Sequence, residues 1–267
     1  RRILIVGGGG REHALAWKLA ADGGEVFVAP GNAGTARCGT NLPIAVTDIE
    51  GLTEAAKTRA IDLVVVGPEA PLVAGLVDAL TAAGIRAFGP SAQAAELEGS
   101  KIFCKELLHA ADIPTATHRQ FRSLEQARQF LDAREDEPVV VKADGLAAGK
   151  GVFVCDTRAE AIDAVEQLRC DPQFSQAARG VLIEERLDGI EVTVTAITDG
   201  RTIVTLPPLQ DHKAAHDADQ GPNTGGIGAF CPAPFVADAL RQAIEERILF
   251  PTIHPNRQPP TPSHRLP

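Results

Sequence analysis

The chain has 267 residues, of which 44 % are hydrophobic and 23 % are charged, so it is long and apolar enough to bury the cores of two domains. Its formal net charge of −9 argues against a general nucleic-acid binder, and no nucleic-acid partner is expected. The absence of a membrane-length apolar run and of any CxxC pair among the five cysteines predicts a reduced, cytoplasmic protein with no membrane partner and no disulfide framework.

The first hundred residues alternate short apolar segments with amphipathic segments of helical period. Strands are expected at 1–7, 25–30, 42–46, 62–69 and 85–90, and helices at about 12–21, 51–60 and 72–83. Continuous apolar strands separated by helices are typical of a parallel sheet covered on both faces. We therefore predict that residues 1–100 form a doubly wound α/β domain that binds ligands at the carboxyl ends of its strands.

A run of four glycines, at 7–10, links the first strand to the first helix. It departs from the dinucleotide-binding fingerprint, because Glu12 or His13 stands where the third glycine belongs. A helix N-terminus still offers unpaired N–H groups to an anion, and Arg11 would add a bidentate partner. The turn predicts a site for a single phosphate, although its glycines could instead serve a tight turn without a ligand.

A helical stretch at about 93–113 leads into a second domain, which we expect to have strands at 138–141, 152–154, 181–184, 191–198 and 202–206 and a helix at 158–168. The first two strands flank a loop of glycines with Lys142 and Lys150. The loop is not a Walker A motif, because only three residues separate Gly145 from Gly149 and Gly151 replaces the metal-binding Ser or Thr. It predicts a phosphate-handling hairpin, and the alternative is an ordinary glycine-rich hairpin with solvated lysines.

Six segments together extend the interpretation: GGGGREHALAWKL, APGNAGTA, GPEAPLVAGLVDAL, VVVKADGLAAGKGV, LIEERLDGIE and QDHKAAHDADQGPNTGGIGAFCPAP. In this order they resemble the phosphoribosylamine–glycine ligase family of ATP-grasp enzymes, over roughly residues 1–250. The resemblance implies an α/β and α+β protein, with a substrate domain at 1–100 and an incomplete ATP-grasp domain at 101–250. The implied reaction joins glycine to 5-phosphoribosylamine at the expense of ATP, through a glycyl phosphate, in de novo purine biosynthesis. A carboxylase or another carboxylate–amine ligase of the ATP-grasp class is disfavoured by GGGGREHA and GPNTGG.

The resemblance also implies roles for individual residues. The set implied to bind ATP is Lys101, Lys142, Gly145, Gly149, Lys150, Gly151, Glu184, Glu185, Leu187 and Glu191, with the adenine hinge at 184–187 and the ribose at Glu191. The set implied to bind phosphoribosylamine and glycine is Gly8, Gly9, Gly10, Arg11, Glu12, His13, Gly67, Pro68, Glu69, Thr224, Gly225 and Gly226. The set implied to be catalytic is Lys142, Asp211, Lys213 and Asn223, of which Asn223 and Thr224 belong to an expected loop at 222–226 that could also be an ordinary turn.

The resemblance ends after Ile248, and residues 251–267 are Pro-rich with no Asp or Glu, which predicts a disordered or extended tail. In this family the residues that bind Mg²⁺ or Mn²⁺ come after this point in the chain. No metal ligand is therefore predicted within the chain, and its end is interpreted as truncated or out of frame. Two hypotheses remain. The chain is a monomeric ligase of this family, or it is an inactive fragment that retains nucleotide or phosphoribosylamine binding.

Overall fold

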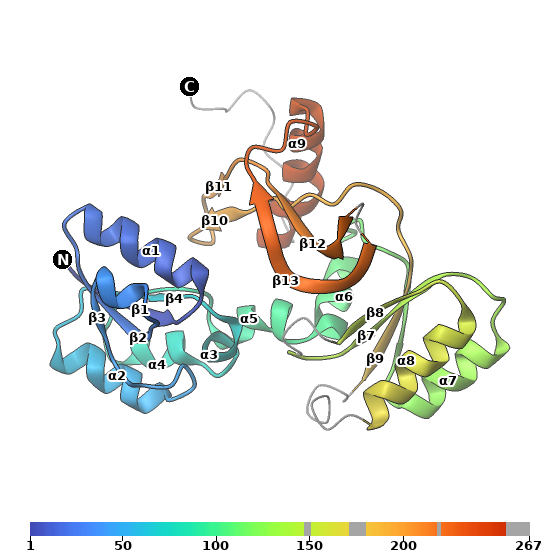
Figure 1. The fold of residues 1–267 in the computed structure, drawn as a ribbon, viewed down its shortest axis with the longest axis horizontal. Coiled ribbons are helices and arrows are strands. Elements are labelled where there is room, and N and C mark those ends of the chain that lie inside the picture. Colours follow the sequence, from blue (N-terminus) through green and yellow to red (C-terminus); the bar gives the residue numbers. More distant parts are fainter. Residues whose placement is uncertain (147–150, 171–179, 218–219, 255–267) are drawn as a thin grey trace. The chain divides into compact units, whose positions relative to one another are not determined.

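The computed structural model describes residues 1–146, 151–170, 180–217 and 220–254. The chain divides after Ser100 into two compact units, each of which is described by itself (Figure 1). None of the helices in these ranges has the length and apolar character needed to cross a lipid bilayer.

The first unit is built on a five-stranded parallel sheet in the order β3-β2-β1-β4-β5. The strands are β1 (Arg2–Gly7), β2 (Glu25–Pro30), β3 (Thr40–Asn41), β4 (Leu63–Val66) and β5 (Ala87–Phe88). Alternate β1 residues face opposite cores: Ile3 and Ile5 pack with Ala16, whereas Leu4 and Val6 pack with residues that include Leu52. Helix α1 (Gly10–Ala21) covers the first face, and α2 (Ile49–Thr58) and α4 (Leu76–Ala82) cover the second (Figure 1). The prediction of a doubly wound parallel sheet is confirmed.

Two predicted elements of this unit differ from the structure. The strand expected at 42–46 does not form: the Leu42 N–H still donates to the Val28 carbonyl, but the Ile44 N–H turns back to the Leu42 carbonyl at 2.7 Å instead of continuing the ladder. The helix expected at 72–83 is two helices, α3 (Glu69–Val73) and α4, separated at Gly75, whose φ of 87° is left-handed. The unit also contains η1 (Thr35–Arg37) and α5 (Ala92–Gly99).

The second unit begins with α6 (Lys101–Ala110) and contains a four-stranded sheet in the order β6-β9-β7-β8. The strands β6 (His118–Phe121), β7 (Val139–Ala143), β8 (Val152–Cys155) and β9 (Val181–Glu185) pair antiparallel. Val139, Val141 and Ala143 pack against α7 (Leu124–Ala133) and α8 (Arg158–Cys170), which lie side by side on one face. The alternate residues Lys142 and Glu184 therefore lie on the other face, where α6 approaches them. The sequence analysis did not predict β6 and α7.

The remaining described residues form two hairpins and a helical segment. Strands β10 (Ala196–Thr198) and β11 (Ile203–Thr205) pair antiparallel, as do β12 (Gln210–His216) and β13 (Gln220–Phe230). Of the strand expected at 191–198, only β10 and one bridge from Thr193 to Leu209 form. The loop expected at 222–226 is instead part of β13, because β12 offers it pairing partners across an irregular register.

The chain continues through α9 (Asp238–Ile244), the π-helical η4 (Glu245–Leu249) and α10 (Phe250–Ile253). Residues 251–253 are thus helical where an extended tail was expected, because α10 continues directly from η4. The rest of that predicted tail, residues 255–267, lies outside the described residues.

Candidate functional site

The parallel pairing of β1 with β4 brings two predicted substrate segments to one edge of the first sheet. Val6 and Val66 are register partners, so the turn at 8–11 and the segment at 67–69 leave the sheet as neighbours. This edge is the point where the strand order reverses, which is where open α/β sheets bind ligands. The structure therefore brings together Gly8, Gly9, Gly10, Arg11, Gly67, Pro68 and Glu69.

Glu12 holds the glycine turn at this edge of the sheet. Its side chain is buried, Oε2 accepts a 2.6 Å hydrogen bond from the Gly9 N–H, and Oε1 has no hydrogen-bond partner among the described residues. A Cβ at Gly7 or Gly67 would overlap the same carboxylate, so both positions require glycine. Gly9, Gly10 and Arg11 are exposed. Because the Gly9 N–H is engaged by Glu12, the amides available to an anion are the following ones in the first turn of α1.

Asn32, in the turn after β2, holds the glycine turn by a hydrogen bond. Its Nδ2 donates to the Gly8 carbonyl at 2.8 Å, and its Oδ1 accepts from the Gly34 N–H at 2.7 Å. The half-buried His13 ring lies against Gly34, where a Cβ would overlap it. Asn32 was not among the predicted site residues, although its place in a glycine-rich turn at the end of a strand was a usable signal.

In the second unit, three charged side chains from three elements converge on the open face of the sheet. Glu184 of β9 is 5 % exposed; its Oε2 lies 2.7 Å from Lys142 Nζ of β7 and its Oε1 lies 3.2 Å from Lys105 Nζ of α6. Two cations thus surround one carboxylate, which leaves an excess of positive charge. Lys142 and Glu184 were predicted, whereas Lys105 was missed, although it stands one helical turn after Lys101 and so on the same side of α6.

Lys101 and Asp144 fix the start of the glycine loop against α6. Lys101 Nζ donates to the Gly145 carbonyl at 2.9 Å, and Asp144 Oδ1 accepts from the Ile102 N–H at 3.1 Å. Gly145 has a φ of 102°, which a side chain would strain. The Gly151 carbonyl accepts from the Ala143 N–H at 2.8 Å, so both described ends of the loop are held. The predicted contacts Gly149 and Lys150 lie outside the described residues.

The predicted adenine hinge follows Glu184 in the chain. The Glu185 carboxylate accepts from the Thr117 N–H at 2.7 Å, and this hydrogen bond holds the pKa of Glu185 below its ordinary value. Glu185 therefore ties β9 to the segment before β6, and a contact with a ligand would come from its backbone. Leu187 is exposed, and Glu191 forms an ion pair with Lys213.

A pocket of about 440 Å³ brings Glu191, the predicted ribose contact, together with Asp211 and Lys213, two of the four predicted catalytic residues. It is lined by Gly189, Ile190, Glu191, Gln210, Asp211, Lys213, Ala214 and Phe235. The Thr224 hydroxyl donates to the Lys213 carbonyl at 2.9 Å and accepts from the Gly226 N–H at 3.1 Å. These two predicted residues therefore stabilise the backbone at Lys213. For Asn223 and Gly225 the structure describes only the backbone, which belongs to β13.

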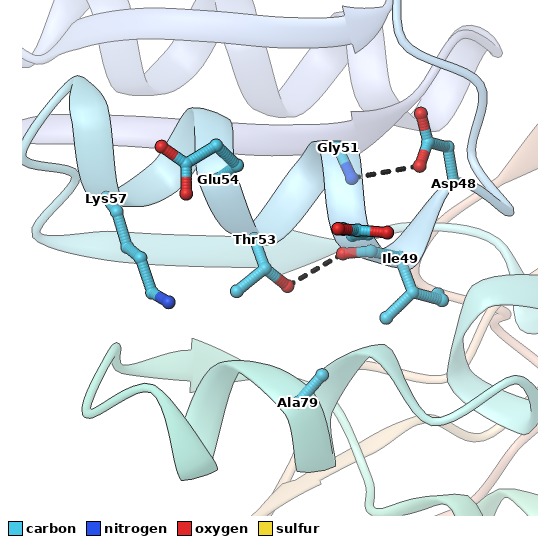
Figure 2. Close-up of a pocket in the computed structure, with 8 residues that line it drawn as sticks. Asp48, Ile49, Gly51, Thr53, Glu54, Lys57 and Ala79 are labelled. Carbon is cyan, nitrogen blue, oxygen red and sulfur yellow. Dashed lines mark hydrogen bonds between the residues drawn. The ribbon is translucent and has the colours of Figure 1, made fainter.

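A larger hollow, of about 910 Å³, lies between α2 and α4 and contains none of the predicted residues (Figure 2). Its polar groups are used within α2: Asp48 caps the helix by accepting from the Gly51 N–H at 2.9 Å, and the Thr53 hydroxyl donates to the Ile49 carbonyl at 2.7 Å. We assign no chemistry to this hollow. Among the residues that the structure describes there is no cluster of three or more Asp, Glu, His or Cys residues that could hold a metal ion.

Comparison with known proteins relates both units to one protein family. Residues 1–98 match the family model of the phosphoribosylglycinamide synthetase N domain, and residues 99–262 match that of its ATP-grasp (A) domain. The second match runs past Ile248, after which the motifs showed no further resemblance.

The chain is 58 % identical over 259 residues to a phosphoribosylamine–glycine ligase from Rhodopirellula baltica. The aligned region covers 94 % of this chain and 59 % of that protein. The solved phosphoribosylamine–glycine ligase of Thermotoga maritima is 34 % identical, with a TM-score of 0.80, over 96 % of this chain and 61 % of that one. The biotin carboxylase domain of a Hydrogenobacter thermophilus 2-oxoglutarate carboxylase, solved with MgADP, shares the fold at 14 % identity and a TM-score of 0.72, over 96 % of this chain and 58 % of that one.

The chain thus spans about three fifths of the length of the proteins that it matches. Both of its units match successive domains of one family, in the same order. The chain therefore belongs to the phosphoribosylglycinamide synthetase family.

Proposed function

We propose that this chain takes part in the ATP-dependent ligation of glycine to 5-phosphoribosylamine, which yields glycinamide ribonucleotide, ADP and phosphate in purine biosynthesis. The observation that carries the proposal is the buried Glu184 between Lys105 and Lys142, together with the Lys101–Gly145 contact just after β7, the strand of Lys142. The cluster offers cations beside a glycine turn for the phosphates of a nucleoside triphosphate, and a hydrogen-bond acceptor for its base.

In this proposal ATP lies on the open face of the second sheet. Lys142 and Lys101 attract its phosphates beside Gly145, the residue at which the glycine loop begins. The Glu184 carboxylate accepts a hydrogen bond from the 6-amino group of adenine, because an ionised carboxylate only accepts. Glu191, on the rim of the 440 Å³ pocket, accepts hydrogen bonds from the ribose hydroxyls.

Phosphoribosylamine would bind at the edge of the first sheet. The N-terminus of α1 and the exposed Arg11 suit its phosphate, and Glu69 suits a ribose hydroxyl. The buried carboxylate of Glu12 would hold the turn in place rather than contact the phosphate, since two anions would repel each other.

The chemistry then needs positive charge more than a protein nucleophile. A glycine carboxylate oxygen attacks the γ-phosphorus and ADP leaves, which forms glycyl phosphate. The amine nitrogen of phosphoribosylamine next attacks the acyl carbon, phosphate leaves, and the nitrogen loses a proton. Lys142 and Lys213 would stabilise the charge on the transferring phosphoryl group, while Asp211 and Asn223 would orient glycine. Mg²⁺ is the expected cofactor, as in the neighbour solved with MgADP.

The test supplies the full chain with ATP, Mg²⁺, glycine and phosphoribosylamine, and measures phosphate release and the mass of the product. Phosphate release that requires both substrates, together with glycinamide ribonucleotide, supports the proposal. ATP binding without any ligation supports the alternative, a non-catalytic fragment. A parallel reaction with Mn²⁺ determines which metal is preferred.

A further inference from the structure

We propose that Lys105 is a positioning residue for nucleotide selection, which holds the Glu184 carboxylate so that it discriminates a 6-amino purine from a 6-oxo purine. This inference rests on the proposed binding of ATP at the Glu184 cluster. It assigns a role to a buried lysine that the proposed reaction does not otherwise use.

The hydrogen bonds of Lys105 show that it does not itself reach a ligand. Its Nζ lies 3.2 Å from Glu184 Oε1, 2.6 Å from the Thr115 hydroxyl and 3.2 Å from the Ala116 carbonyl. An ammonium group has three N–H donors, so these three acceptors use all of them. The residue is also only 8 % exposed. Lys105 therefore acts on a nucleotide through Glu184.

The two lysines around Glu184 differ in their freedom to move. The Lys142 side chain is 26 % exposed, whereas that of Lys105 is 10 % exposed and hydrogen-bonded to the segment before β6. When Lys142 turns towards a phosphate, Lys105 remains beside Glu184. When a buried carboxylate loses its last counterion, either it takes up a proton or its burial as an unpaired anion costs free energy. Lys105 thus keeps the Glu184 carboxylate paired and fixed in position while Lys142 serves the phosphates.

This role makes base selectivity the informative measurement. Adenine presents a donor at position 6, whereas hypoxanthine presents a carbonyl acceptor that an ionised carboxylate repels. A lysine that merely stabilised α6 against β9 would, when removed, weaken ATP and ITP binding by the same factor. A lysine that positions Glu184 would, when removed, weaken ATP binding and reduce the preference for ATP over ITP.

The experiment measures the dissociation constants of ATP and ITP, each with Mg²⁺, by calorimetry on the full chain. In Lys105→Met we expect ATP binding to weaken about tenfold and the preference for ATP over ITP to fall several-fold. Thr115→Val removes one acceptor of Lys105 without changing any charge, and should shift the preference in the same direction by less. Lys18→Met is the matched control, because this exposed lysine pairs with Asp22 in the first unit; both affinities should stay unchanged.

A double-mutant cycle with Glu184→Gln completes the test, because Lys105→Met should have little further effect once the carboxylate is gone. An equal loss of ATP and ITP affinity in Lys105→Met, or full additivity in the cycle, overturns the role of Lys105. If Lys105→Met does not fold, an unchanged preference in Thr115→Val overturns it. If the wild-type chain binds neither nucleotide, the proposed function itself fails, which is a distinguishable result.

Discussion

The carboxylate of Glu12 lies directly beneath Gly67, so that a Cβ at Gly67 would overlap its Oε1. The same carboxylate holds the N–H of Gly9, and thus one buried side chain sets the positions of the segments after β1 and β4. The candidate substrate site therefore depends on the absence of side chains at Gly67 and Gly7.

This relationship predicts the effect of Gly67→Ala. The added methyl group must displace a buried carboxylate, so we expect a loss of about 1–3 kcal/mol in the free energy of unfolding, measured by urea denaturation. Gly10→Ala is the control, because nothing lies within 4 Å of a Cβ there and alanine favours the helix; it should leave stability unchanged or raise it. Equal stability of Gly67→Ala and wild type would show that Glu12 moves aside freely.

Arg11→Ala should separate the two candidate binding sites. Loss of a charge-assisted contact to phosphate is worth about 1.5–3 kcal/mol, so phosphoribosylamine binding should weaken roughly tenfold to a hundredfold while ATP binding is unchanged. Arg86→Ala is a suitable control, because this exposed arginine precedes β5 and lies at the opposite end of the strands. Calorimetric titration with each ligand checks the prediction, and a parallel loss of both affinities would contradict the division of the sites.

Lys142→Met should weaken ATP binding by tenfold or more without unfolding the second unit. Glu184 remains paired with Lys105 in this variant, so its charge is still compensated and the melting temperature should change by only a few degrees. Arg128→Met, which breaks the surface pair with Glu166 between α7 and α8, should leave ATP affinity unchanged. Wild-type ATP affinity in Lys142→Met would place the nucleotide elsewhere.

Cys155 should react slowly with thiol reagents in the folded protein. Burial against the α7–α8 face raises its pKa to about 11, so the reactive thiolate is scarce at pH 8. The exposed Cys231 serves as the internal reference, and mass spectrometry after brief alkylation should find it modified well before Cys155. Modification of both at the same rate would mean that this core opens readily.

The raised pKa of Cys155 also has a consequence for stability against pH. Between its ordinary pKa of 9.0 and the folded value of about 11, the unfolded thiol loses its proton while the folded thiol keeps it. The folded state then binds more protons, so stability falls as pH rises through this window and is fully retained below it. Urea midpoints should therefore decline less steeply with pH in Cys155→Ala than in the wild type.

The sequence by itself determined the elements whose pattern is local. The β-branched runs of β1, β4, β7 and β9 predict strands because such residues fit a buried pleated sheet, and the glycine turn after β1 predicts an anion site because helix N-termini expose N–H groups. The family motifs predict that Lys142 and Glu184 belong to one nucleotide site, and in the structure the two side chains form an ion pair.

Only the tertiary structure decided features that depend on distant partners. Lys105 lies beside Glu184 because α6 packs on the face of the sheet that carries this carboxylate. Helical spacing puts Lys105 on the same side of α6 as Lys101, but it does not show which strand that side meets. Residues 222–226 join β13 because β12 supplies pairing partners, although their composition is that of a turn. Glu12 is buried under Gly67 rather than exposed with Arg11, because the parallel pairing of β1 with β4 closes over it. In each case the deciding free energy comes from contacts between segments far apart in the chain, which local propensity does not contain.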